Sequence, residues 1–122
     1  MEPEQGSRKY DLEERTFLFA RRIRRFVKQI PKTLSNHDDS KQLVRASGSV
    51  GANYIEANES LGDKDFLYRI KICRKEAKEC LYWARLLDLE STSELEAERS
   101  ALLNEATELM RIFGAIIRKR SP

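Results

Sequence analysis

Three glutamates in the middle of the chain, Glu56, Glu76 and Glu79, are the residues best suited to chemistry. Carboxylates that face the interior of a helical bundle can hold a pair of iron or manganese ions, as they do in ferritin-like proteins. Such sites also require two Glu-x-x-His pairs, whereas Glu76 and Glu79 form Glu-x-x-Glu and the single histidine falls in an expected loop. We therefore expect no metal site and no cofactor. The simpler interpretation is that Glu56 and Glu76 fix the register of neighbouring helices by pairing, the candidate partners being Arg45 and Asn53.

Nucleophilic catalysis has no candidate pair of residues in this sequence. Ser47 and Ser49 have no histidine within helical reach, so they are better interpreted as small packing residues. Cys73 and Cys80 lie seven residues apart on one expected helix, which is unsuitable for a disulfide, and no Cys-x-x-Cys motif is present. We expect two reduced, buried thiols and a protein that is not an enzyme. A carboxylate-based bundle enzyme is the alternative, and elemental analysis for iron or manganese would reveal it.

Positively charged residues are the remaining chemical feature, and they are unevenly distributed. The formal net charge is only +3, yet residues 8–32 hold nine lysines and arginines against three acids. Residues 88–108 hold seven acids and one arginine, and the tail from Arg111 is again basic, with Arg118, Lys119 and Arg120 and no acids. This asymmetry says more about binding partners than the net charge does.

Helical geometry gathers the basic side chains into two stripes. At about 100° per residue, they share one arc of the expected first helix and one arc of the expected third, each opposite the apolar core line. Two such stripes suit the phosphate backbone of RNA or another nucleic acid, contacted without reading its bases. The alternative is a solvated face or a surface for a protein partner. The residues expected to contact phosphates are Arg21, Arg24, Arg25 and Lys28 on the first helix, and Lys71, Arg74, Lys75 and Lys78 on the third.

The elements that must position these residues are helices, because apolar residues recur at steps of three and four in four segments. We expect helices at about 11–34, 40–61, 63–89 and 93–119, with Pro31 loosening the last turn of the first. The connections are short, which favours antiparallel neighbours. The sequence therefore predicts an all-α fold, an antiparallel up-down-up-down four-helix bundle over residues 11–120, preceded by a flexible segment at 1–10.

Small residues interrupt the second of these helices between Ala46 and Ala52. Glycine in a helix interior costs about 1 kcal/mol relative to alanine, so Gly48 and Gly51 indicate the close approach of another helix. The expected third helix also places tyrosines on its outer arc. They add more outward-facing apolar surface than is usual for a monomer. Base stacking on these tyrosines is the alternative to burial at a subunit contact. The residues expected at an oligomer interface are Gly48, Gly51, Ala52, Tyr68 and Tyr82.

No targeting segment is recognisable. The first fifteen residues lack the apolar stretch of a signal peptide, and no apolar run approaches the length of a membrane span. We therefore expect a cytoplasmic protein that does not contact a membrane.

A family resemblance is carried by the segment QLVRASGSVGANYIEANES, which begins at Gln42, and by the following KDFLYRIKICRKEAKECLYWARLL. These segments resemble the four-helix-bundle proteins encoded in intervening sequences of bacterial 23S ribosomal RNA genes. The family pattern reads approximately QLxRSxxSVGANxxEA, followed by a charged turn, a helix with KEA and a YW pair before LL. The resemblance covers about residues 12–119, and Ala46-Ser47-Gly48 is a local departure from the pattern.

The resemblance implies a homopentameric ring of four-helix bundles without catalysis. It extends in fold to the accessory protein of diversity-generating retroelements, a basic pentamer that associates with nucleic acid and a reverse transcriptase. It supplies no binding residues. We therefore expect a non-enzymatic homo-oligomer, a pentamer by this resemblance, that binds RNA or another nucleic acid. The alternative is a protein-interaction scaffold or accessory protein that does not bind nucleic acid directly.

Overall fold

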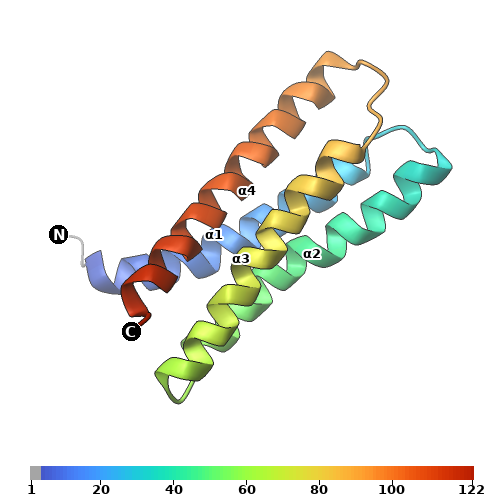
Figure 1. The fold of residues 1–122 in the computed structure, drawn as a ribbon. Helices are drawn as coiled ribbons and strands as arrows, with labels where there is room; N and C mark the ends of the chain where they lie inside the picture. Colours follow the sequence, from blue (N-terminus) through green and yellow to red (C-terminus); the bar gives the residue numbers. More distant parts are fainter. Residues whose placement is uncertain (1–3) are drawn as a thin grey trace.

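The computed structural model describes the backbone of residues 4–122 and the side chains from Leu12 onward. Its helices are α1 (Glu4–Val27), α2 (Leu34–Asn58), α3 (Asp63–Leu86) and α4 (Ser93–Arg120), and consecutive helices run antiparallel (Figure 1). α2 packs against both α1 and α3, and α3 packs against α4. The predicted all-α antiparallel four-helix bundle is therefore confirmed.

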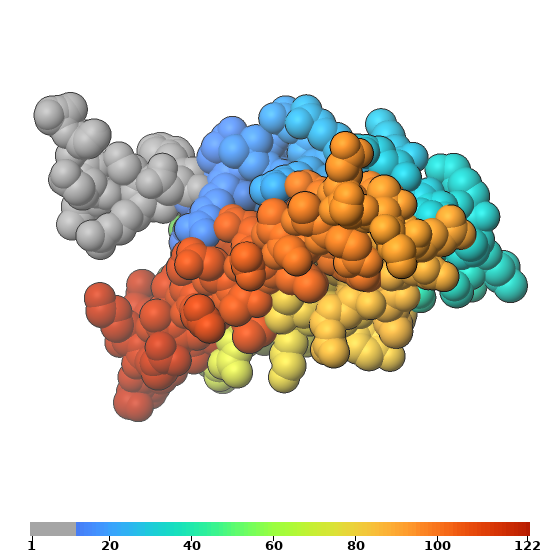
Figure 2. All heavy atoms as spheres, turned by 90° about the horizontal axis from the view of Figure 1, so that it is seen from above, coloured from blue at the N-terminus to red at the C-terminus, as the bar shows by residue number. Residues whose placement is uncertain are grey.

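α1 and α3 occupy opposite corners of the bundle. Each contacts α2 and α4, but within the described residues the backbones of α1 and α3 do not approach each other closely. Figure 2 shows one consequence: α4, in orange and red, lies between α1 in blue and α3 in yellow. The outer faces of α1 and α3 therefore look in different directions.

The first helix is displaced from its predicted range of 11–34, since it begins at Glu4 and ends at Val27. It ends at Val27, and α2 starts at Leu34 rather than near residue 40. Pro31 explains the difference, because proline lacks a backbone N–H and disfavours helical geometry in the residue before it. Thr33 then caps α2, its hydroxyl accepting a 3.1 Å hydrogen bond from the backbone N–H of Asn36. Leu34, which the prediction placed in the first helix, is 82% exposed.

The second and third helices also end earlier than predicted, at Asn58 rather than 61 and at Leu86 rather than 89.

One buried side chain organises the loops at the far end of the bundle. The amide of Asn36 donates to the carbonyls of Pro31 and Asp88, both at 2.9 Å, and accepts from the Asp88 N–H at 2.9 Å. These bonds join the α1–α2 loop to the α3–α4 loop, which lie side by side in Figure 1.

The core follows the predicted apolar lines of all four helices. Phe26 of α1, Leu43 of α2 and Phe113 of α4 are among the largest fully buried side chains. Ile70 and Cys73 contribute from α3. Burial of apolar side chains contributes about 25 cal/mol per Å² removed from water, so this shared core is the main source of stability.

Ion pairs supplement the packing between α1 and α4. Arg15 donates to Glu105 at 2.6 Å and to Glu108 at 2.9 Å. Arg22 donates to Glu98 at 2.6 Å and 2.8 Å through two nitrogens. The acid-rich segment noted in the sequence therefore neutralises one side of α1 rather than facing solvent alone.

Of the predicted N-terminal segment, residues 4–10 belong to α1 rather than preceding the first helix, whereas residues 1–3 lie outside the described residues and their flexibility stays a prediction. Across the described helices, none combines the length and the apolar character needed to cross a bilayer.

Candidate nucleic-acid interface

The predicted basic residues of α3 lie together along its boundary with α4. Lys71, Arg74, Lys75 and Lys78 line a shallow hollow of about 330 Å³ with Ile117 of α4. A second hollow of about 230 Å³ adjoins it through Arg74 and is also lined by Met110, Arg111, Gly114 and Arg118. We call the combined surface the basic groove, defined by Lys71, Arg74, Lys75, Lys78, Arg111 and Arg118.

Helical spacing explains how both helices present cations to one groove. On α3 the basic residues project from the arc opposite the buried Ile70 and Cys73. On α4, Arg111 and Arg118 are separated by two turns and therefore share a face. Gly114 lies between them, and a Cβ at that position would be 3.5 Å from Arg118 Nη1. That is an ordinary contact distance, so the Arg118 guanidinium lies next to the α4 backbone at Gly114.

The cations of the basic groove are almost unneutralised by the chain itself. Among the described residues, five of the six form neither an ion pair nor a side-chain hydrogen bond, and Lys75 is 3.9 Å from the nearest carboxylate oxygen, on Glu76. Six like charges with free donors create a positive potential over a concave surface. Such a surface attracts anions, and phosphate is the anion for which arginine forks are well suited.

Arg111 and Arg118 are functional candidates that the sequence analysis did not assign. The sequence feature that could have indicated them is the basic tail from Arg111, which was interpreted only as a charge asymmetry. The sequence alone does not reveal that α4 brings these two arginines beside α3, because that depends on the register between the helices.

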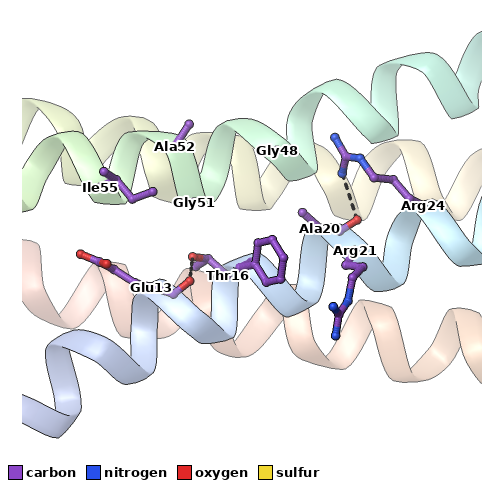
Figure 3. A pocket seen from close by; sticks show the side chains of 10 residues that line it. Glu13, Thr16, Ala20, Arg21, Arg24, Gly48, Gly51, Ala52 and Ile55 are labelled. Carbon is purple, nitrogen blue, oxygen red and sulfur yellow. Dashed lines mark hydrogen bonds between the residues drawn. The ribbon is translucent and has the colours of Figure 1, made fainter.

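The predicted basic stripe of α1 is also exposed, but part of it is engaged within the chain. Arg24 donates to the Ala20 carbonyl at 2.9 Å, to Ser47 Oγ at 3.3 Å and to the Val44 carbonyl at 3.4 Å. Arg21 points away from α2 (Figure 3) and its guanidinium lies 5.3 Å from the ring centre of Phe17. Arg25 is exposed on α1, and Lys28, which was predicted on the first helix, lies directly after its end at Val27 and is also exposed.

The two predicted stripes do not form one surface. One belongs to α1 and the other to α3, the helices at opposite corners of the bundle. A nucleic acid that contacted both stripes of a single chain would have to pass around α2 or α4. The structure therefore separates two candidate interfaces that the sequence analysis treated together.

The predicted interface residues are likewise divided between two places. Tyr68 and Tyr82 are exposed on the outer face of α3, 59% and 55% respectively. Gly48, Gly51 and Ala52 instead line a hollow of about 380 Å³ between α1 and α2 (Figure 3). We call this surface the apolar groove, because its lining is mostly Phe17, Ala20, Gly48, Gly51, Ala52 and Ile55.

The close approach predicted at Gly51 is made within the chain. A Cβ at position 51 would lie 2.9 Å from Thr16 Oγ1 and 3.3 Å from Thr16 Cβ, so glycine is what lets α1 and α2 meet here. Thr16 is itself fixed, since its hydroxyl donates to the carbonyls of Leu12 and Glu13 at 2.8 Å and 3.1 Å. The need for glycine at position 51 is thus met without a second subunit.

The polar pairs predicted around the central glutamates are partly correct. Arg45 donates to Glu76 at 3.4 Å and to Glu79 at 2.9 Å, which joins α2 to α3 as expected. Asn53 pairs differently, accepting from Arg69 at 3.0 Å. Glu56 is exposed and its carboxylate forms no ion pair among the described residues. Nor does any group of three or more potential metal-ligating acids, thiols and imidazoles occur within that part of the chain.

The two thiols are free and buried, as predicted. Burial raises the pKa of both Cys73 and Cys80 to about 12, so each is a neutral thiol at physiological pH. The Cys73 thiol donates to the Val50 carbonyl at 3.4 Å. Neutral, enclosed thiols of this kind are packing residues rather than nucleophiles.

Comparison with known proteins identifies similar chains. The model of the 23S rRNA-intervening sequence protein family matches residues 8–115. A crystal structure of a protein of unknown function from the S23 ribosomal protein family of Bacteroides thetaiotaomicron is 30% identical in sequence, with a TM-score of 0.73. The match covers 90% of this chain and 97% of that one. No curated protein matches the sequence.

Proposed function

Because the chain belongs to the 23S rRNA-intervening sequence protein family, we propose that it is a non-enzymatic protein that binds RNA or another nucleic acid through the basic groove. The observation that carries this proposal is the gathering of six cations from α3 and α4 on one concave surface. No carboxylate of the described residues lies closer than 3.9 Å to a lysine there. Contacts of this kind engage phosphates and supply affinity without reading sequence.

Cations at the contact between α1 and α4 are paired with carboxylates, and this contrast supports a functional role for the charges of the basic groove. On the α1 side, Arg15 and Arg22 are neutralised by glutamates of α4. Among the residues whose side chains are described, Arg15 and Arg22 thus have carboxylate partners, whereas five of the six cations of the basic groove have none. Arg25 of α1 and Lys28, directly after this helix, are a secondary contact region in this proposal, since they too are exposed.

Self-association accompanies nucleic-acid binding in the proposal, and a second copy of the chain is the occupant of the apolar groove. Phe17 and Ile55 are 54% and 51% exposed at its rim, although both are large apolar side chains. Gly48 and Ala52 leave the floor open to a partner helix. The family resemblance leads us to expect a homopentamer, in which several basic grooves would act on one nucleic acid.

Charge reversal tests the proposed site. The variant Lys71→Glu/Arg74→Glu/Lys78→Glu is compared with Arg21→Glu/Arg25→Glu/Lys28→Glu, which changes the net charge by the same amount on α1. We expect the α3 variant to lose about 100-fold or more in RNA affinity and the α1 variant to lose clearly less, because the basic groove makes the main phosphate contacts and Arg25 and Lys28 make only secondary ones. Circular dichroism and light scattering check that fold and mass are retained.

Unchanged affinity in the α3 variant would contradict the proposed site. Equal losses in both variants would show that the overall field, rather than the basic groove, drives binding. If the wild-type chain binds no nucleic acid at low salt, a protein-interaction scaffold becomes the better account, and the charged surfaces would then serve protein recognition.

A further inference from the structure

The outer face of α3 carries aromatic side chains beside the basic groove. Tyr68 and Tyr82 are more than half exposed, and helical geometry places them within about 40° of each other around the α3 axis. They are about 21 Å apart along that axis, with Lys75 halfway between them. A row of aromatic, cation and aromatic side chains therefore follows the rim of the basic groove.

Each tyrosine ring is supported by one neighbour and keeps a surface toward solvent. The Arg69 guanidinium lies 5.7 Å from the ring centre of Tyr68. Tyr82 packs edge-to-face on Trp83, with ring centres 4.9 Å apart and an interplanar angle of 80°. Lys71 and Lys78 project from the same arc, turned toward α4 and into the groove. The rings are thus adjacent to the lysines rather than on a separate apolar patch.

We propose that the basic groove takes single-stranded nucleic acid, with bases stacking on Tyr68 and Tyr82 while the lysines and arginines contact phosphates. This inference rests on the proposed function and adds the class of nucleic acid. A duplex keeps its bases stacked on each other and offers only its backbone to such a surface. A single strand exposes base faces that stack on aromatic side chains without regard to sequence, so it alone uses both features of this face.

The same residues, Tyr68 and Tyr82, were expected from sequence at a subunit contact. Their surroundings favour the nucleic acid, because the exposed rings are interleaved with cations that would have to be buried without partners in a contact between identical copies. Charge complementarity thus selects a polyanion as the occupant of this face.

The test compares two probes and two double variants of the full chain. The probes are a fluorescently labelled RNA strand of about 12 nucleotides without self-complementarity, and the same strand annealed to its complement. The variants are Tyr68→Ala/Tyr82→Ala, which removes the rings, and Tyr68→Phe/Tyr82→Phe, which keeps them. Affinities are measured by fluorescence anisotropy and the mass of each free variant by light scattering.

We expect the wild type to bind the single strand more tightly than the duplex. The alanine variant should lose about tenfold or more in affinity for the single strand and change by less than about twofold for the duplex, and the phenylalanine variant should bind as the wild type does. Equal binding of both probes, or an alanine variant with unchanged single-strand affinity, would overturn the inference while leaving nucleic-acid binding in place.

Two further outcomes are distinguishable. A lower oligomer mass in the alanine variant would assign the tyrosines to a subunit contact and overturn the inference. Absence of binding to either probe by the wild type would overturn the proposed function, and the inference with it.

Discussion

The apolar groove and the basic groove are both formed by a pair of adjacent antiparallel helices with a glycine beneath them, yet the glycines serve different purposes. Gly51 lies against Thr16, whose hydroxyl is fixed by two backbone carbonyls, so the α1–α2 pair closes on it. Gly114 lies under the guanidinium of Arg118, at an ordinary contact distance and beside a movable side chain. A glycine in a helix thus indicates a close neighbour, and the effect of replacing it depends on whether that neighbour is rigid.

The grooves also differ in what they leave for a ligand. The apolar groove keeps Phe17 and Ile55 at its rim, and one of its cations, Arg24, is held by α2. In the basic groove, five of the six cations form no ion pair with any described residue, and Lys75 is 3.9 Å from Glu76. One surface is therefore suited to a helix and the other to an anion, and the two can be occupied at the same time.

The largest effect is expected from Gly51→Leu. A leucine there cannot avoid Thr16 and the α1 backbone, so we expect a loss of about 3 kcal/mol or more in the free energy of unfolding, measured with urea. Ala52→Leu is the matched control, because Ala52 is exposed and one residue further along α2. It should change the stability of the monomer by less than about 0.5 kcal/mol.

Light scattering on the same two variants separates folding from assembly. A reduced mass for a stably folded Ala52→Leu variant would support a second copy in the apolar groove. A Gly51→Leu variant as stable as the wild type would show that α1 and α2 do not meet closely at Thr16, and the comparison between the grooves would fail.

Replacing glycine with alanine should have smaller effects on the free energy of unfolding, and these should be of opposite sign at Gly51 and Gly114. Gly51→Ala places a Cβ 2.9 Å from Thr16 Oγ1 and should destabilise the protein by about 1–3 kcal/mol. Gly114→Ala places a Cβ 3.5 Å from Arg118 Nη1, so the better helix propensity of alanine should stabilise the protein by up to about 1 kcal/mol. Thermal and urea unfolding measure both, and two changes of the same sign would contradict the distinction drawn here.

The smallest effect concerns the side of α1 that faces α4. The hydrogen bonds from Arg22 hold the pKa of Glu98 below its ordinary value of 4.5. Because the pKa is lower in the folded state, the stabilisation is present above pH 4.5 and is lost as the pH falls through the folded pKa. Both side chains are partly exposed, so we expect no more than about 1 kcal/mol.

The measurement is the urea midpoint between pH 6 and pH 3 for the wild type and Glu98→Gln. The difference between the two proteins should shrink as the pH falls below about 4.5. A difference that stays constant over this range would show that the pair with Arg22 contributes nothing measurable.

The features that could be predicted from the sequence are those that follow from the spacing of residues along a single helix. The bundle, its core lines and the exposed arc of Lys71, Arg74, Lys75 and Lys78 follow from periodicity, which is a local property. The early end of α1 was not predicted, because Pro31 was expected only to loosen the last turn of the first helix. In the structure, α1 ends before Pro31, and Thr33 caps a new helix directly after it.

The candidate site was only half predictable, because it depends on which helices become neighbours. Arg111 and Arg118 join the α3 cations through the register of α4 against α3, and no local pattern reveals that register. The same limit applies to Gly51, whose contact with Thr16 joins residues far apart in the sequence. Periodicity indicated that a helix approaches closely there but not that it belongs to the same chain.

The most direct test of nucleic-acid binding by the basic groove is the salt dependence of RNA binding by the wild-type protein, measured with the single-stranded probe between about 50 and 300 mM salt. If all six cations of the basic groove contact phosphates, the logarithm of the association constant should fall with the logarithm of the salt concentration with a slope of about −4. A slope near zero, or no binding at the lowest salt concentration, would show that the cations of the basic groove do not contact phosphates.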